Sequence, residues 1–371
     1  MENQLNRSRA IEPQISTYLH AKASRLGIPV SGTFELTPRC NFSCRMCYVH
    51  QQKLPEGQQE LTAEQWLAIG RQAVDAGMVF LLLTGGEPFV RPDFAEIYTG
   101  LKAMGLVVSV NTNASLLSGK NMELLAKNPP SRLNISLYGG CAQTYEALCR
   151  VPAYDSVIRS LEQIAEIGIP VRLNVSVTPY NRSDLAAIYA TARRLGFQIK
   201  ASAYMFPPMR LGGAAGEAPA RFEAEEAAAA AVECNEQQYS LQELQQMAAG
   251  YYPSSHEDCT GSEGTSMLCR AGSSSFWLKW DGRMVPCGMF PQEGFDVQTM
   301  GLAGAWQAVR AMTQAIRLPP ECRTCTSRSR CCVCAAVCYT ENGAFDKKPE
   351  YVCRMTDAIA DIMKKKYGET L

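Results

Sequence analysis

Short apolar or β-branched runs alternate with amphipathic stretches from residue 31 to about residue 235, and this alternation restricts the fold more than any other feature. Segments such as MVFLLLTGGEP and PVRLNVSVTP are typical of buried strands, whereas LTAEQWLAIGRQAVDAG and YDSVIRSLEQIAEIG have helical periodicity. The pattern gives six strand–helix units if the Ala- and Glu-rich stretch RFEAEEAAAAAVEC is the sixth helix. Because repeated units of this kind build parallel sheets with right-handed crossovers, we expect an α/β fold with a parallel sheet.

Polar residues and glycines cluster where the expected strands end. In parallel sheets the loops after the carboxyl ends of the strands collect the reactive groups, so these residues are expected to share one rim. The candidates, in chain order, are Gly85, Gly86, Glu87, Asn111, Asn113, Ser136 and Asn174.

Charge and hydropathy exclude two classes of partner. The chain has 36 basic and 36 acidic residues, so no basic excess is available to neutralise nucleic-acid phosphates or an anionic membrane surface. The first residues lack the apolar core of a signal peptide, and the sequence has no apolar run of about 18 residues that could span a membrane. We therefore expect a cytoplasmic protein with no nucleic-acid partner and no membrane partner.

The sixteen cysteines are expected to be metal ligands or reactive thiols, because cytosolic thiols are kept reduced. They form two groups, one of three cysteines at residues 40–47 and one of ten at residues 259–353. The three that lie between the groups are Cys141, Cys149 and Cys234. The sequence therefore predicts two metal-binding regions on either side of a segment with few cysteines.

The first group, CNFSCRMC, places Cys40, Cys44 and Cys47 in a C-x3-C-x2-C spacing. Zinc and iron–sulfur centres usually take four protein ligands, so one ligand is missing. His50 is the nearest residue that could complete a structural zinc site. The alternative is a [4Fe–4S] cluster whose fourth iron is open to a small ligand, and three cysteines on the rim of a parallel sheet favour it.

The same motifs resemble the radical S-adenosylmethionine (SAM) superfamily. CNFSCRMC is similar to its three-cysteine motif, TGGEP to the glycine-rich element after its second strand, and LYGGCAQTYEALCRVPAYDSV to the stretch after its fourth strand. The resemblance covers residues 33 to about 210. It implies a partial (βα)6 TIM-like barrel at residues 31–235, preceded by an N-terminal extension at residues 1–30.

The resemblance also implies a role for each candidate on the rim. Cys40, Cys44 and Cys47 would ligate three irons of a [4Fe–4S] cluster, and SAM would chelate the fourth iron through its amino and carboxylate groups. Met46 stands where the family usually has an aromatic residue against the adenine, and a thioether can also pack on that ring. The residues implied in SAM binding are Gly85, Gly86 and Glu87 at the amino group, Arg150 at the carboxylate, Ser136 and Asn174 at the ribose, and Asn113 beside them.

The C-terminal cysteines resemble the SPASM extension of radical SAM enzymes, which holds two auxiliary [4Fe–4S] clusters, and residues 236–371 are assigned to it. The predicted first set is Cys269, Cys287 and Cys338, with Cys259 as a candidate fourth ligand. The predicted second set is Cys322, Cys325, Cys331 and Cys353, and Cys332 and Cys334 compete for places in the two sets. A pair of zinc ribbons is the alternative that the C-x2-C spacing leaves open.

The function implied by the resemblance is radical chemistry. A 5′-deoxyadenosyl radical derived from SAM would abstract hydrogen from a substrate, and we expect that substrate to be a ribosomally made peptide that undergoes crosslinking, thioether formation or epimerisation. A low-potential flavodoxin or ferredoxin would supply electrons. The roughly 30 residues before the first strand are too few for a leader-binding domain, so a separate leader-binding protein is expected.

Three alternatives to this function stay open. An anaerobic sulfatase maturase would have an aspartate after the cysteine at position 287, where this chain has Gly288. A small-molecule dehydrogenase or a haem-side-chain enzyme has the same architecture, and a metal-binding scaffold would have no activity. Cys141, just past the fourth expected strand, is a candidate thiol hydrogen donor, whereas Cys149 and Cys234 are expected to behave as small apolar residues.

Overall fold

The structure is a computed structural model that describes residues 12–47, 54, 56–207, 220–250, 269–290, 293–331 and 333–368. Its strands form one nine-stranded sheet in the order β6-β5-β4-β3-β2-β1-β7-β8-β9. Strands β1 to β7 are parallel, whereas β8 and β9 are antiparallel to their neighbours. The strands are β1 (Ser31–Glu35), β2 (Phe80–Thr84), β3 (Val107–Thr112), β4 (Arg132–Ser136), β5 (Val171–Ser176), β6 (Gln198–Ser202), β7 (Ser275–Leu278), β8 (Arg283–Val285) and β9 (Phe295–Asp296).

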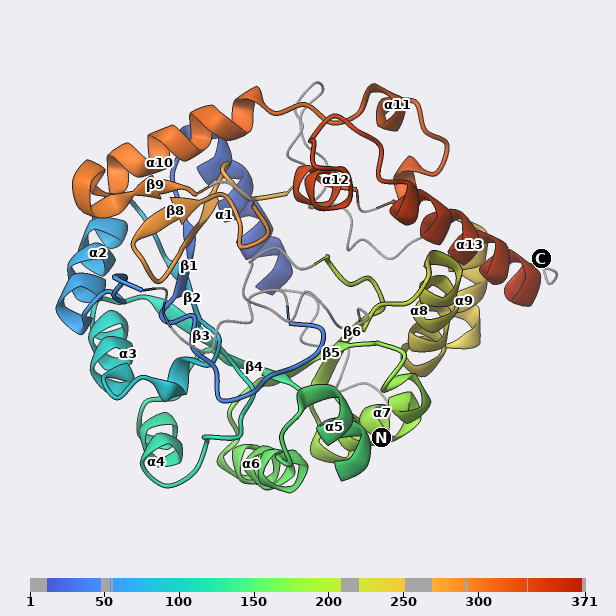
Figure 1. The fold of residues 1–371 in the computed structure, drawn as a ribbon, viewed down its shortest axis with the longest axis horizontal. Coiled ribbons are helices and arrows are strands. Elements are labelled where there is room, and N and C mark those ends of the chain that lie inside the picture. The colour runs from blue at the N-terminus through green and yellow to red at the C-terminus, as the bar shows by residue number, and fades with distance from the viewer. Residues whose placement is uncertain are drawn as a thin grey trace.

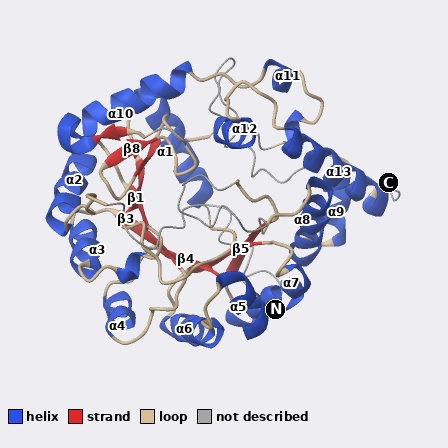
Figure 2. Ribbon diagram, viewed as in Figure 1, coloured by secondary structure: helices blue, strands red, loops and turns tan. Residues whose placement is uncertain are grey.

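Helices surround the outer side of the curved sheet (Figures 1 and 2). Those of the barrel part are α1 (Glu12–Leu26), α2 (Ala63–Asp75), α3 (Phe94–Ala103), α4 (Lys120–Lys127), α5 (Ala142–Cys149), α6 (Tyr154–Ile167), α7 (Leu185–Leu195) and α8 (Ala224–Gln238). Those that follow are α9 (Leu241–Ala248), α10 (Val297–Ala315), α11 (Pro320–Arg323), α12 (Ala335–Asn342) and α13 (Glu350–Tyr367). Three short 3-10 turns are η2 (Pro88–Val90), η3 (Arg182–Asp184) and η5 (Arg328–Arg330). The predicted α/β fold is confirmed, and the Ala- and Glu-rich stretch is the helix α8.

The two faces of the sheet differ in chemistry because side chains alternate along each strand. On β4 and β5 the residues Leu133, Ile135, Val171 and Leu173 are buried in the core beneath the helices. The residues between them, which lie on the concave face, are polar from β3 to β6. They are Ser109, Asn111, Arg132, Asn134, Ser136, Arg172, Asn174, Ser176, Gln198, Lys200 and Ser202. A polar concave face is suited to a bound polar molecule rather than to a packed apolar interior.

The C-terminal part of the chain shares the sheet and the core of the barrel. β7 pairs with β1 in parallel, and its Phe276 and Leu278 belong to the main core together with Trp306 of α10 and Met355 of α13. The sequence did not indicate β7, because this strand has only four residues and a Ser- and Gly-rich segment precedes it. The predicted boundary between residues 235 and 236 stays a prediction.

An ion pair fastens the C-terminal helices to the segment that precedes α8. Arg221 donates to Glu341 of α12 at 2.6 Å, and its guanidinium carbon lies 3.6 Å from the ring centroid of Tyr351 on α13. Tyr204, just after β6, donates its hydroxyl to the same Glu341 at 2.7 Å. These contacts hold α12 and α13 beside the open edge of the barrel, as Figure 1 shows.

Across the described ranges of the chain, the structure has no helix that is both long and apolar enough to span a membrane.

Candidate active site at the carboxyl ends of the strands

The loop that carries the first three cysteines is docked on the last turn of α5. The backbone N–H groups of Ser43 and Arg45 donate to the carbonyl oxygens of Cys149 and Leu148 at 3.3 and 3.0 Å. The guanidinium of Arg45 donates to the Ala147 carbonyl at 2.9 Å. The free carbonyls at the end of a helix need partners, and this loop supplies them. The contacts fix the loop beside the rim.

The thiols of Cys44 and Cys47 lie close enough to Cys40 for their charges to affect its pKa. Burial, together with the nearby charges of Glu87, Cys44 and Cys47, raises the pKa of Cys40 to about 12. A hydrogen bond with Cys149 raises the pKa of Cys44, and burial adds to the effect. Buried thiolates are costly without a compensating positive charge, and cluster irons would supply one. Thiolates are the ligands that iron–sulfur clusters take, so the chemistry of the three donors fits such a cluster, whereas the described side chains are not arranged around a metal ion.

The glycines of the TGGEP element are required by the segment that leads to Cys40. The N–H of Gly86 donates to the Thr37 carbonyl at 2.8 Å, and the N–H of Glu87 donates to the Arg39 carbonyl at 2.9 Å. A Cβ atom at Gly85 would lie 2.6 Å from the Thr37 carbonyl oxygen, and one at Gly86 would lie 2.4 Å from that of Arg39. The two loops can therefore approach each other only where residues 85 and 86 have no side chain.

Gly86→Ala is expected to separate these two loops. The added methyl meets backbone atoms that cannot rotate away, so we expect a loss of about 1–3 kcal/mol in the free energy of unfolding and a lower iron content after reconstitution. Urea unfolding and iron analysis measure both. Gly304→Ala is the matched control, because its Cβ meets only the Met300 Cβ at an ordinary 3.5 Å. If the two variants had the same free energy of unfolding and the same iron content, the assignment of Gly86 to the contact between the two loops would be contradicted.

Glu87 is fully buried and is held by three donors. Its carboxylate accepts from the Phe89 N–H at 3.2 Å, the Thr112 hydroxyl at 2.9 Å and the Asn113 N–H at 2.7 Å. Burial raises the pKa of Glu87 to about 7, and these hydrogen bonds oppose the rise. The carboxylate is thus fixed in position beside the loop that precedes Cys40, where it can pair with an ammonium group.

Asn113 joins the cysteine loop to the neighbouring rim loops. Its side-chain amide donates to the Asn41 side chain at 2.9 Å and lies 3.9 Å from the sulfur of Cys40. Its side-chain oxygen accepts from the Ser115 hydroxyl at 2.7 Å. The structure therefore brings together Cys40, Glu87 and Asn113, three of the residues that the sequence predicted for this site.

Tyr138 is a residue of the rim that the sequence analysis missed. Burial raises the pKa of its hydroxyl, the charges of Cys44, Cys149 and Cys47 add to the rise, and a hydrogen bond with Ser136 opposes it. Ser136 lies at the end of β4 and is aligned with Asn174 of β5. Tyr138 thus places an aromatic ring near the cysteine loop.

Two residues near the site have left-handed backbone conformations that side chains other than glycine rarely adopt. Among the described residues, they are the only non-glycine residues with positive φ: Ala114, with φ 62°, next to Asn113, and Arg150, with φ 60°, at the end of α5. Such conformations cost about 1–3 kcal/mol and concentrate at functional sites. Arg150 is the C-cap of α5, and its N–H donates to the Glu146 carbonyl, so the role that the sequence predicted for it stays a prediction.

Arg150→Asn is expected to weaken SAM binding without unfolding the chain. Asparagine tolerates the left-handed conformation but removes the cation proposed to pair with the SAM carboxylate. We expect the dissociation constant for SAM to rise by about tenfold, equivalent to about 1.4 kcal/mol. Equilibrium dialysis measures it, with Arg194→Gln as the control because Arg194 forms an exposed ion pair with Glu162. Unchanged affinity in Arg150→Asn would exclude the role.

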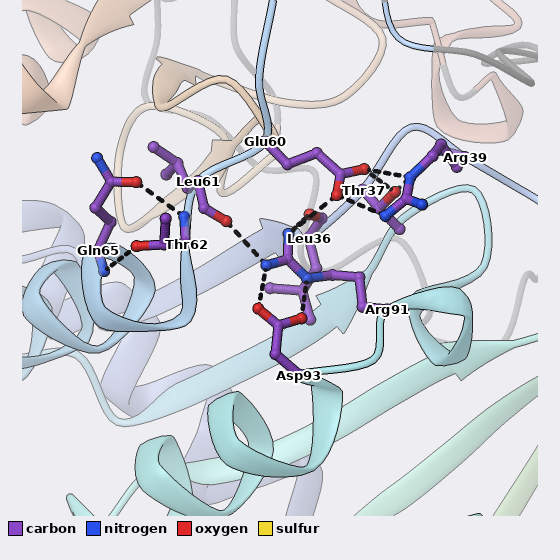
Figure 3. Close-up of polar contacts among 9 residues, drawn as sticks. All are labelled: Leu36, Thr37, Arg39, Glu60, Leu61, Thr62, Gln65, Arg91 and Asp93. Carbon is purple, nitrogen blue, oxygen red and sulfur yellow. Dashed lines mark hydrogen bonds and ion pairs between the residues drawn. The ribbon is translucent and has the colours of Figure 1, made fainter.

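A buried ion network behind the rim was also missed by the sequence analysis. Figure 3 shows Glu60 between the guanidinium groups of Arg39 and Arg91. Arg39 donates to both oxygens of Glu60, at 2.8 and 2.7 Å, and Thr37 also donates to Glu60. Arg91 is 5% exposed and pairs with both oxygens of Asp93, at 2.9 and 2.7 Å.

The network connects three loops through backbone groups as well as side chains. Arg91 donates to the carbonyls of Leu36 and Leu61 at 2.8 and 2.9 Å. Burial raises the pKa of Asp93, but the hydrogen bond and charge of Arg91 outweigh it and hold the pKa below its ordinary value. The segment before Cys40, the segment before α2 and the loop after β2 are therefore fixed to one another. The sequence signal is the pair of charges in RPD, directly after GGEPFV.

One set of C-terminal cysteines lies at a cavity beside the sheet. The cavity has a volume of about 360 Å³ and is lined by Cys269 and Cys287, with Thr33 of β1 and Trp277 of β7. Burial raises the pKa of Cys287 to about 12, and the charges of Cys269 and Cys334 add to the rise. The neighbour of Cys269 and Cys287 is thus Cys334, whereas the sequence analysis placed Cys338 with them.

A second set lies among α11, η5 and α13. Burial raises the pKa of Cys322, and Cys331 and Cys325 contribute. Burial also raises the pKa of Cys353 to about 11, with contributions from Cys331 and Cys322. The four cysteines of the predicted second set are therefore neighbours. Cys338 packs with Cys322 and Val333, and its pKa is raised to about 12 by burial first and then by Cys322, Cys334 and Cys331.

The other cysteines have separate environments. Cys141 is exposed at the start of α5, with its sulfur 3.4 Å from the Thr144 hydroxyl and 3.9 Å from an Asp184 carboxylate oxygen. Cys149 is buried beside Cys44, and Cys234 is buried in α8. Cys259, Cys332 and His50 lie outside the described residues. Within the described part, no three side chains of His, Cys, Asp or Glu are arranged to hold a metal ion, so the metal ligands stay predictions.

Comparison with known proteins identifies the class of the barrel. Residues 34–192 match the Radical SAM superfamily model. The chain thus carries a radical SAM domain, and the predicted resemblance is confirmed. The chain is 24% identical over 333 residues to "AdoMet-dependent heme synthase" of Methanosarcina barkeri, and the match covers 86% of this chain and 94% of the relative.

Two solved structures share the fold of nearly the whole chain. SuiB of Streptococcus suis bound to S-adenosylmethionine matches with a TM-score of 0.67 and 17% identity, over 91% of this chain and 81% of SuiB. anSMEcpe with bound AdoMet matches with a TM-score of 0.67 and 14% identity, over 92% of this chain and 100% of anSMEcpe. These likenesses show that the fold of this chain, including the C-terminal extension, is shared with SuiB and anSMEcpe.

Proposed function

We propose that this chain is a SAM-dependent radical enzyme that abstracts a hydrogen atom from a peptide bound at the concave face of the barrel. The observation that carries the proposal is the convergence of three thiols, the Glu87 carboxylate and Asn113 on one rim. The radical SAM domain at residues 34–192 supports the assignment of these residues.

Each residue of the rim has a proposed task. Cys40, Cys44 and Cys47 hold a [4Fe–4S] cluster, which when bound supplies the electron that converts SAM into methionine and a 5′-deoxyadenosyl radical. The loop Gly85–Glu87 receives the SAM amino group, Arg150 receives its carboxylate, and Asn113 keeps the cysteine loop and the Glu87 loop together. Ser136 and Asn174 face the ribose. The polar network behind the rim keeps these groups in place and limits the access of water.

The C-terminal cysteines are proposed to hold two auxiliary [4Fe–4S] clusters as a SPASM extension. Cys269, Cys287 and Cys334 form the first set, with Cys259 as the candidate fourth ligand. Two observations support this choice: Cys269 and Cys287 line one cavity, and the charge of Cys334 raises the pKa of Cys287. Cys322, Cys325, Cys331 and Cys353 form the second set. Cys338 lies beside the second set.

The peptide substrate is supported by the neighbouring structures. One of these structures is SuiB bound to the precursor peptide SuiA, and another is anSMEcpe with bound AdoMet and a Cp18Cys peptide. The same proposal includes a flavodoxin or ferredoxin as electron donor, a separate leader-binding protein, and Cys141 as hydrogen donor. The fold and the described geometry are compatible with them.

The experiment incubates the reconstituted enzyme with SAM, dithionite and candidate precursor peptides, taken from any short reading frames that neighbour the gene, under anaerobic conditions. Mass spectrometry should show a loss of two hydrogens for a crosslink, or deuterium incorporation from D2O for an epimerised residue. An unmodified peptide, together with 5′-deoxyadenosine formation that does not depend on the peptide, would contradict the peptide assignment.

A carboxylated small molecule is the second candidate substrate. The chain matches 94% of the length of the haem synthase relative, at a higher identity than it has to the peptide-bound neighbours. In the same assay, SAM cleavage stimulated by a porphyrin carboxylate but not by the peptide would favour this candidate.

A further inference from the structure

The concave face of the barrel carries cations but no acid along its last strands. From β3 to β6 this face presents Arg132, Arg172 and Lys200, while its other residues are neutral. The register aligns Arg172 with Asn134 on one side and Gln198 on the other, and it aligns Lys200 with Asn174. Three positive charges are therefore gathered on one surface within the barrel.

The two arginines are neighbours on this face of the sheet. Arg132 donates to the Asn134 side chain at 3.1 Å. The Nε atom of Arg172 is buried and has no hydrogen-bond partner. Burial lowers the pKa of Arg172, and the positive charge of Arg132 lowers it further. Within the described ranges, no carboxylate forms an ion pair with either guanidinium.

Amide side chains connect this pair of arginines to the rim. Asn134 donates to the Asn111 side-chain oxygen at 3.0 Å, and Asn111 donates to the Thr84 hydroxyl at 3.3 Å. Thr84 directly precedes Gly85. Arg132 is thus held through Asn134 in a fixed orientation on the concave face, rather than free to turn toward solvent.

The repulsion between the two guanidinium groups and the Nε–H of Arg172 without a hydrogen-bond partner both destabilise the fold when no anion is bound. Such an arrangement costs stability unless an anion compensates it, and the planar fork of arginine matches carboxylate and phosphate oxygens. We propose that Arg132 and Arg172 form an anion subsite that binds a carboxylate or phosphate group of the substrate. The inference deepens the proposed function and rests on it for the position of the reacting carbon.

The position of the subsite restricts the substrate. Arg132 and Arg172 lie at the amino ends of β4 and β5, and Ser136 and Ser176 lie four residues further along the same strands. At about 3.3 Å per residue this corresponds to about 13 Å between the subsite and the rim. The substrate class is therefore a molecule whose anionic group is about 13 Å from the carbon that loses hydrogen, as in a peptide with an acidic side chain a few residues from the modified one.

The test measures the thermal midpoint of the anaerobically reconstituted enzyme with inorganic phosphate and, separately, with triglutamate, against potassium chloride at equal ionic strength. In the wild-type enzyme we expect at least one of the two anions to raise the midpoint by about 2 °C. A response to phosphate alone would assign a phosphorylated substrate, and a response to triglutamate alone would assign a carboxylated one.

Arg172→Gln should remove the response to anions. Without anion, this variant should unfold at the same temperature as the wild type or at a higher one, because it loses an uncompensated buried charge.

Controls separate a binding role from a structural one. Arg172→Lys keeps the charge and should keep part of the response, and Arg194→Gln, on the outer surface, should keep all of it. The proposal is overturned if neither anion stabilises the wild type beyond chloride, if Arg172→Gln responds like the wild type, or if Arg172→Gln unfolds at a lower temperature without anion. The yield of 5′-deoxyadenosine is measured in the same preparations, and it tests the proposed function independently of the anion subsite.

Discussion

Replacement of Cys44 by alanine is expected to abolish the cleavage of SAM. Cys44 is the middle thiol of the rim loop, it is buried beside Cys149, and its pKa is raised through the hydrogen bond with Cys149 and through burial. A [4Fe–4S] cluster that already has only three protein ligands is not expected to survive the loss of one. Bound iron should fall by about four atoms per chain, and 5′-deoxyadenosine should fall to the level without enzyme.

Cys234→Ala is the control for this experiment. Cys234 is also a buried cysteine, with a pKa that burial raises to about 12, but it lies in α8, and the charges that act on its pKa are those of Glu233 and Arg182. Its loss should leave the iron content and the yield of 5′-deoxyadenosine unchanged. A Cys44→Ala enzyme that keeps both would show that this loop does not hold the cluster.

Arg91→Gln is expected to destabilise the chain by about 3 kcal/mol and to reduce cluster content. The substitution leaves Asp93 without its partner and removes the donors to the Leu36 and Leu61 carbonyls, all at a site where Arg91 is 5% exposed. Since the Leu36 carbonyl lies four residues before Cys40, the cysteine loop should lose its fixed position. Urea unfolding and iron analysis measure the two effects.

Arg39→Gln tests whether burial is the reason for this cost. Arg39 pairs with Glu60 in the same network, but its side chain is 37% exposed and Glu60 keeps a contact with Arg91 at 3.5 Å. We expect a loss below about 1 kcal/mol. If the two arginine variants were equally stable, the network would have no role in holding the rim.

The barrel and the first cysteine site could be predicted because their signals are local. Alternation of strands and helices indicates a parallel sheet, and the ends of its strands indicate the rim. Glycines 85 and 86 were expected to let a ligand approach. The structure gives a further reason, because their missing side chains let the loop after β2 reach the backbone of Thr37 and Arg39.

The features that were missed depend on contacts between distant segments. Glu60, Arg91 and Asp93 look like ordinary surface charges until the fold brings them together behind the cysteine loop. β7 was missed because a short strand is recognised by its partner β1 rather than by its own pattern. The proximity of Cys334 to Cys287 also follows from folding, because spacing alone does not distinguish Cys334 from Cys338.

The central claim is tested most directly by reconstituting the chain anaerobically with iron and sulfide and incubating it with SAM and dithionite. The account predicts about twelve irons per chain for three [4Fe–4S] clusters, and 5′-deoxyadenosine together with methionine as products. Zinc as the native metal and the absence of 5′-deoxyadenosine would contradict it.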